Sequence, residues 1–201
     1  STAIPSEITV NIAGDIEDQQ DTFGDLITLL ILIVILVYMV MASQFESLMS
    51  PFVIMFSIPF ALTGVALGCM ITGTAIGVMA LIGVIILMGI VVKNGIVLID
   101  YTILLQERGY EVKEAVVTAC KSRLRPILMT TLTTVLGMVP MAIGTGEGSE
   151  MWRSLGITVA WGLTVSTLVT LIIIPTVYTS FVEAGNRRRA RKAARIAAKN
   201  A

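Results

Sequence analysis

Residues 84–101 read VIILMGIVVKNGIVLIDY, an apolar stretch long enough to cross a bilayer, with Lys93 and Asn94 in its middle. The chain around it has 201 residues, of which 55% are hydrophobic and 14% are charged. Soluble domains are roughly 45–50% apolar and about 25% charged, so this composition is typical of a membrane protein. It predicts an all-α membrane fold, in which the lysine inside a span needs an explanation.

Five apolar stretches reach the roughly 17–25 residues that a transmembrane helix needs. They cover residues 26–42, 52–71, 75–104, 126–143 and 154–182. Pro59 is expected to kink the second span, whereas Pro126 fits the start of the fourth. Gly64 and Gly68 form a GxxxG pair, a spacing that lets two membrane helices approach closely.

Two segments outside the spans are expected to be structured. Residues 7–13, EITVNIA, alternate apolar and polar side chains, which predicts a half-buried strand within the N-terminal segment 1–25. Residues 107–122 are interpreted as a short amphipathic helix along the membrane surface, although a plain soluble connector fits equally well. Its expected apolar face carries Tyr110, Ala115, Val116 and Ala119.

Basic residues are distributed unevenly between the two ends of the spans. Segment 105–125 and the tail at 187–199 together carry twelve Lys and Arg residues, whereas the opposite side carries only Arg153. By the positive-inside rule, the N-terminus lies outside and the C-terminus is cytoplasmic. We expect the basic tail at 183–201 to be solvated near anionic headgroups and not to bind nucleic acid.

Several classes of chemistry are disfavoured by the residue content. The chain has no histidine, which argues against His-ligated metals and His-based catalysis. Cys69 lies in an apolar run and Cys120 in a polar segment, so both are expected to be free thiols. No Walker-type phosphate loop is present, and an ATPase is therefore not indicated.

Lys93 has no evident counter-ion in this sequence. It is about eleven residues, or roughly 16 Å, from the end of its helix, near the midplane of a ~30 Å hydrocarbon core. A charge there costs about 2.5–3.5 kcal/mol on insertion scales. Of the fourteen acids, only Asp100 is near. It lies about 10.5 Å further along the axis, whereas helical side chains lean the other way.

Two interpretations of Lys93 stay open on this reasoning. Either it is neutral or hydrogen-bonded to hydroxyls and carbonyls for structural reasons, or it pairs with an acid on a segment outside this chain. Buried lysines shift their pKa readily, so such a pair would suit a proton relay. The fourth span supplies a set of hydroxyls that could complete a network, namely Thr130, Thr131, Thr133 and Thr134.

Four long motifs resemble a known family. They are MASQFESLMSPFVIMFSIPFALTGV (41–65), GIVVKNGIVLIDY (89–101), RLRPILMTTLTTVLGMVPMAIGTGEGSE (123–150) and IIIPTVY (172–178). Together they are similar to the C-terminal membrane portion of resistance-nodulation-division (RND) efflux transporters, of the hydrophobe/amphiphile (AcrB, acriflavine-resistance) type. The resemblance implies the last five spans of a twelve-span fold, with residues 1–25 ending a periplasmic domain.

The resemblance also implies a function and a set of partners. Members are secondary active transporters and not enzymes; they need no cofactor, because the proton-motive force drives drug efflux. They are homotrimers in the bacterial inner membrane, and they work with a periplasmic adaptor protein and an outer-membrane channel on amphiphilic small molecules. The remaining spans and the periplasmic domains of such a polypeptide would be further partners of this chain.

By motif position, the resemblance assigns a proton relay. An aspartate pair on the fourth span of the full protein works with Lys93, Thr130 and Arg123, and Asn94 follows the lysine. Asp100, Thr131 and Thr134 are candidates for supporting polar contacts. Because the aspartate pair lies outside this chain, we expect no transport by the chain alone. The alternatives are a non-transporting scaffold or pump remnant, a channel along the Thr-rich span, and a heavy-metal-type exporter.

Overall fold

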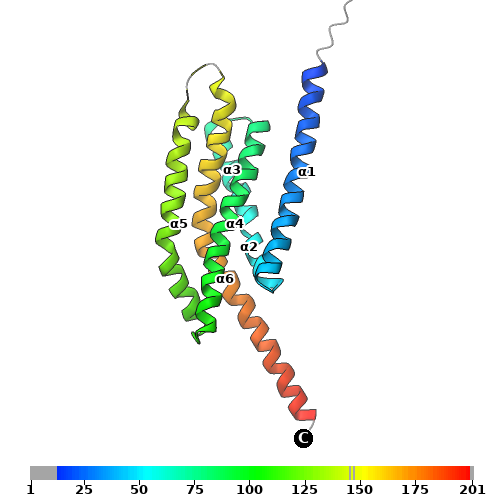
Figure 1. Ribbon diagram of the computed structural model, residues 1–201, viewed down its shortest axis with the longest axis vertical. Helices are drawn as coiled ribbons and strands as arrows, with labels where there is room; N and C mark the ends of the chain where they lie inside the picture. Colours follow the sequence, from blue (N-terminus) through cyan, green and yellow to red (C-terminus); the bar gives the residue numbers. More distant parts are fainter. Residues whose placement is uncertain (1–12, 145, 147, 200–201) are drawn as a thin grey trace, which may run out of the picture.

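The computed structural model describes residues 13–144, 146 and 148–199, and all regular secondary structure in them is helical. The helices are α1 (Ala13–Gln44), α2 (Met49–Met55), α3 (Ser57–Thr72), α4 (Val78–Glu107), α5 (Val112–Ile143) and α6 (Ser149–Lys199) (Figure 1). The all-α prediction is therefore confirmed. Of the strand expected at 7–13, residues 7–12 lie outside the described part, and Ala13 is the first residue of α1.

Five stretches of helix are long and apolar enough to cross a membrane, as the sequence predicts. They are Asp18–Gln44, Met49–Thr72, Val78–Glu107, Val112–Ile143 and Ser149–Val182. Four of them begin before the apolar run that identified them, because a helix continues into polar residues after it leaves the hydrocarbon core. The acidic residues Asp18, Asp21 and Asp25, for example, are exposed and lie in the first turns of the first span, within α1. The third span begins at Val78 and not at 75, and it ends at Glu107, three residues later than expected.

The second span consists of two helices, α2 and α3, because the helix is interrupted at Phe56. Pro59 has no backbone N–H, so the carbonyl of Met55 cannot accept the usual bond from a residue four positions later. The expected kink thus occurs one turn before the proline. Gly73, with a φ of 63°, ends α3 in the left-handed conformation that glycine adopts most easily.

Helix α5 differs from the sequence expectation in two ways. Pro126 does not start the helix but lies inside it, and residues 112–122 continue directly into the span instead of forming a separate element. Membrane helices tolerate an interior proline when neighbouring groups satisfy the freed backbone atoms. Ala115, Val116 and Ala119 are buried as expected, whereas Tyr110 precedes the helix and is 44% exposed.

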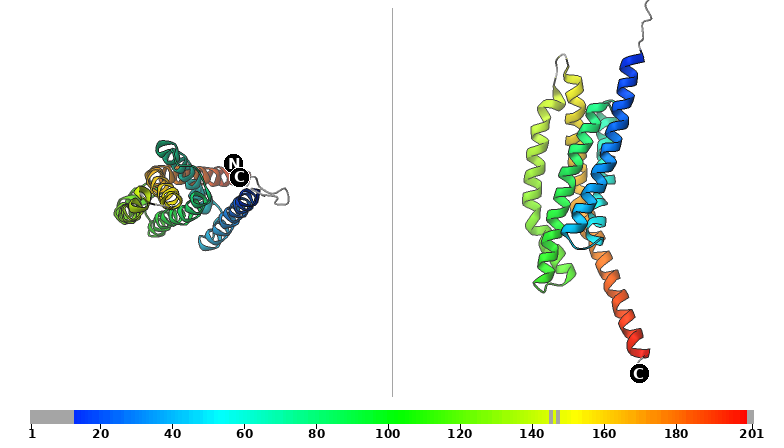
Figure 2. Two further views of the ribbon diagram at one scale, coloured as in Figure 1. Left: turned by 90° about the horizontal axis from the view of Figure 1, so that it is seen from above. Right: turned by 45° about the vertical axis from the view of Figure 1, so that its right-hand side comes forward.

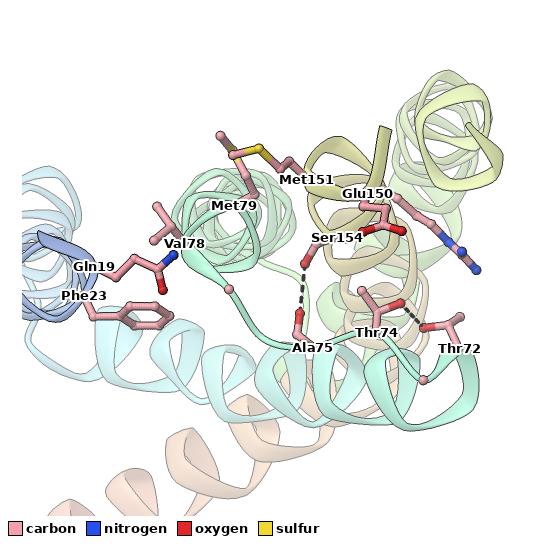
Figure 3. A pocket seen from close by; sticks show the side chains of 13 residues that line it. Gln19, Phe23, Thr72, Thr74, Ala75, Val78, Met79, Glu150, Met151 and Ser154 are labelled. Carbon is pink, nitrogen blue, oxygen red and sulfur yellow. Dashed lines mark hydrogen bonds between the residues drawn. The ribbon is translucent and has the colours of Figure 1, made fainter. Parts of the chain in front are cut away.

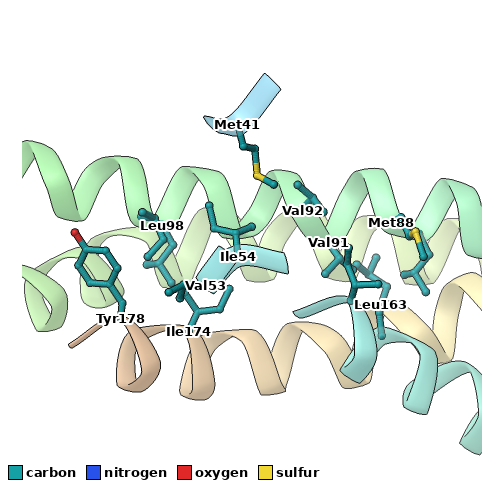
Figure 4. Packing of buried hydrophobic residues seen from close by; sticks show 14 of the residues in the cluster. Met41, Val53, Ile54, Met88, Val91, Val92, Leu98, Leu163, Ile174 and Tyr178 are labelled. Carbon is teal, nitrogen blue, oxygen red and sulfur yellow. The ribbon is translucent and has the colours of Figure 1, made fainter. Parts of the chain in front are cut away.

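Helix α6 lies at the centre of the bundle and packs against α3, α4 and α5 (Figure 2). The core of the bundle is apolar and is formed by residues such as Ile54 of α2, Leu98 of α4, and Leu163 and Ile174 of α6 (Figure 4). The GxxxG pair serves the predicted close approach, since a Cβ atom on Gly68 would lie 2.5 Å from the Cβ of Trp161 on α6. Both cysteines are free, as expected.

Helix α1 stands at the edge of this bundle. In the described part of the chain it packs only against α2 and α4, and only 6% of the residues in the most apolar stretch of its span are buried. The span of α5 is 11% buried, although α5 also packs along α6. Both helices therefore present long apolar surfaces that the described residues do not cover.

Candidate functional site

Lys93 lies on an exposed face of α4. Exposed residues recur along this helix at Ile86, Gly89, Lys93, Asp100 and Leu104. Spacings of three, four and seven residues place them on one side. The opposite side carries buried residues that contact α6. We call this exposed side of α4 the lysine face.

The lysine face is bordered by α1 and α5. Both helices pack on α4 from different sides, and they do not contact each other within the described residues (Figures 1 and 2). Asn94 is only 9% exposed and lies on the buried side of α4, so it does not share the lysine face. Nothing lies within 4 Å of a Cβ atom built on Gly89, one turn before Lys93.

Lys93 has no ion pair or hydrogen bond to any other residue that the structure describes. Asp100, the one acid close in sequence, is exposed further along the lysine face and is not paired with it. The described part of the chain thus supplies no counter-ion for Lys93, as the sequence predicts.

Thr130 and Thr134 satisfy their hydroxyls within α5. The Thr130 hydroxyl donates to the carbonyl oxygens of Pro126 (3.1 Å) and Ile127 (2.9 Å). The Thr134 hydroxyl donates to the carbonyl oxygen of Thr130, at 2.8 Å. Such back-bonding is common for threonine in membrane helices. The structure therefore does not join either residue to Lys93.

Thr131 pairs with a residue of α6 and not with Lys93, for which the sequence makes it a candidate supporting contact. It is buried, and its hydroxyl lies 3.1 Å from that of Thr167, which joins α5 to α6. Interhelical hydrogen bonds of this kind contribute on average about 0.6 kcal/mol in membranes. Thr131 thus stabilises the bundle, and it is not part of the lysine face.

Arg123 is partly buried against an aromatic ring. Its guanidinium carbon lies 4.6 Å from the ring centroid of Tyr101 on α4, within the range of a cation–π interaction. Its Nε atom is buried and has no hydrogen-bond partner among the described residues. Sequence reasoning did not single out Tyr101, because a contact between residues 101 and 123 depends on how α4 and α5 pack.

A separate cavity of about 490 Å³ opens where the turn between α3 and α4 meets α1 and α6 (Figure 3). Gln19 and Phe23 line it from α1, and Glu150 from α6. The Ser154 hydroxyl donates to the carbonyl oxygen of Ala75 at 3.2 Å and holds the turn against α6. Lys93 lies roughly 21 Å along α4 from the cavity residue Met79, so the cavity is not part of the lysine face.

Comparisons with known proteins agree on one class. The profile of the AcrB/AcrD/AcrF family matches residues 1–182. The swarming motility protein SwrC of Bacillus subtilis (strain 168) is 39% identical over 175 residues, which are 87% of this chain and 17% of SwrC. Two crystal structures of a heavy metal efflux pump have TM-scores of 0.74 and 0.70, with 32% and 31% identity.

The fold and these matches together define a membrane bundle of the RND transporter class. Within that class, the chain belongs to the AcrB/AcrD/AcrF family. It spans 17% of SwrC and 16% of each heavy metal efflux pump chain, while 83% of the chain aligns with the pump structures.

Proposed function

We propose that this chain is the C-terminal part of the membrane domain of a proton-driven multidrug efflux pump, and that it contributes the basic side of the proton relay. The observation that carries the proposal is the position of Lys93, which lies in the middle of a span on a face that nothing in the described chain covers. A bare ammonium group facing lipid at that depth would be costly.

In the proposal, this cost is avoided because a second group of spans in the same polypeptide packs on the lysine face and carries the aspartate pair. An opposite charge within about 4–6 Å favours the charged forms of both groups. When a carboxylate takes up a proton, its attraction for Lys93 is lost, and the two helices are free to shift. Gly89 supports this packing, because a residue without a side chain lets another helix come close to α4.

In this scheme Arg123 provides a second fixed charge at the relay, and Thr130 must exchange its helical carbonyl partners for a relay group. The proposed location is the bacterial inner membrane, with the N-terminus periplasmic and the C-terminus cytoplasmic. The complete pump would be a homotrimer that works with a periplasmic adaptor and an outer-membrane channel to export amphiphilic molecules.

Tyr101 is expected to hold Arg123 in place for this role. Tyr101→Leu removes the aromatic ring, a contact that contributes about 0.5–2 kcal/mol. Transport by the complete pump should then fall several-fold, and its pH profile should shift because Arg123 changes position relative to the titrating groups. Tyr101→Phe keeps the ring and should behave as the wild type. An unshifted profile in Tyr101→Leu would contradict the assignment.

The proposal also predicts what the chain does in isolation. The 201-residue chain, purified and reconstituted in liposomes with a pH gradient, should move neither protons nor a fluorescent dye, because half of each ion pair is missing. Co-reconstitution with the remainder of its natural polypeptide should restore proton-dependent dye transport. Transport by the chain alone would refute the shared relay.

Heavy-metal export is a second candidate, favoured by the likeness to the two heavy metal efflux pump structures. Among the described residues, no group of three or more His, Cys, Asp or Glu side chains could hold a metal ion. Cargo recognition would then reside in other parts of the polypeptide. Resistance assays of the complete pump against amphiphilic drugs and against metal salts would distinguish the two cargoes.

A non-transporting scaffold is the third alternative, and the DNA sequence upstream of these residues distinguishes it from the pump. An upstream reading frame encoding seven spans, with an Asp-Asp pair in the fourth, would support the pump. A stop codon followed by an independent promoter would support the scaffold.

A further inference from the structure

A groove of about 400 Å³ runs along α5 and α6, and Thr72, the last residue of α3, borders one end of it. Its walls are almost entirely apolar, and they include Val135, Val139 and Ile143 from α5 with Ile157 and Trp161 from α6. Helices α3 and α5 both pack on α6 but do not contact each other within the described part, which leaves the groove open. Seen from above, α6 lies between α5 and α3 (Figure 2).

The length of this groove matches one leaflet of a bilayer. Its lining on α6 extends from Arg153 to Thr164, eleven residues or roughly 16 Å of helix. Half of a ~30 Å hydrocarbon core is about 15 Å. Arg153 lies near the start of α6, and Thr72 and Ile143 are the last residues of α3 and α5. The arginine is therefore at headgroup depth when the apolar part is at acyl-chain depth.

The charge of the groove selects an anionic occupant. Among the lining residues that the structure describes, Arg153 is the one that carries a charge, and its side chain is exposed. Arg153 also borders the neighbouring cavity, where Glu150 lies one turn earlier on α6, but Glu150 does not line the groove. A guanidinium group binds phosphate oxygens through paired, charge-assisted hydrogen bonds. A phosphate at the mouth and one hydrocarbon chain along the walls would complement every part of the groove.

We propose that this groove is a binding site for an anionic phospholipid, with one acyl chain along α5 and α6 and the headgroup phosphate on Arg153. The groove is lined by other residues than the lysine face, and Lys93 is not among them. The proposal goes beyond proton-driven export and does not depend on it, because it uses residues that the relay does not contain.

The test uses the complete natural polypeptide in nanodiscs of phosphatidylcholine doped with phosphatidylglycerol that carries a diazirine on one acyl chain. After photolysis, mass spectrometry should find label on peptides from 135–143 and 157–164. In Arg153→Gln this label should fall roughly fivefold, in line with the attraction of one basic residue for an anionic surface. Arg153→Lys should retain most of it.

Two matched variants separate the parts of the site. Arg125→Gln removes an exposed arginine from α5 outside the groove and should leave the label unchanged. Ala160→Phe fills the groove without touching Arg153 and should also reduce labelling. A diazirine phosphatidylcholine probe that labels the groove equally well, with no effect of Arg153→Gln, would overturn the proposal. So would cross-links from the groove to a second polypeptide.

Discussion

Lys93→Met in the complete pump is expected to abolish proton-coupled export. Methionine keeps the length and the apolar stem of the side chain but removes the charge, so the proposed carboxylates lose their basic partner. A negative charge inside the membrane domain is then left uncompensated, which is costly. The measurement is drug resistance of cells, together with dye transport in liposomes under an imposed pH gradient.

The control for this variant is Lys121→Met, which makes the same replacement at an exposed lysine on α5. It should leave transport and expression unchanged. Lys93→Met should also be expressed at the wild-type level, since Lys93 is exposed and makes no ion pair or hydrogen bond with the described residues. Resistance retained by Lys93→Met at normal expression would exclude Lys93 from the relay.

The second large effect is expected at the contact between α3 and α6. In Gly68→Leu, the new Cβ would lie 2.5 Å from the Cβ and 2.6 Å from the Cγ of Trp161. Both distances are shorter than non-bonded carbon atoms adopt. Overpacking of a core typically costs about 1–3 kcal/mol, and here the backbones of two helices must separate. We expect a much lower melting temperature and little folded protein.

Gly137→Leu is the matched control, because nothing lies within 4 Å of a Cβ atom at this position of α5. Fluorescence-detected size-exclusion chromatography after heating compares the two variants directly. The close-packing account would fail if Gly68→Leu melted at the same temperature as Gly137→Leu.

The five spans were predictable because hydrocarbon thickness fixes how many apolar residues a helix needs. Their ends were not, since a hydropathy pattern reports where the hydrocarbon stops and not where the helix does. Asp18 and Asp21 continue α1 beyond its apolar run, and residues 112–122 continue α5. The prediction that Pro126 starts a helix was wrong for a related reason. A proline at this position fits a helix start as well as it fits a tolerated site inside a membrane helix.

The candidate site was predictable in part. The positions of the acidic residues in the sequence predict that Lys93 has no carboxylate partner among the described residues, because ion pairing needs a charge of opposite sign within a short distance. The choice among adjacent threonines was beyond a sequence pattern: Thr131, and not Thr130, meets α6, which depends on the rotation of α5. The contact of Tyr101 with Arg123 likewise requires the packing of two helices to be known.

The most direct test of the account is the structure of the complete polypeptide that carries these residues, determined by electron cryomicroscopy in a lipid nanodisc. We expect a carboxylate oxygen within about 4 Å of the Lys93 Nζ atom, the usual limit for an ion pair, on a helix that is not part of residues 1–201. A lysine face in contact with lipid, or Lys93 paired with a group from this chain such as Asp100, would contradict the account.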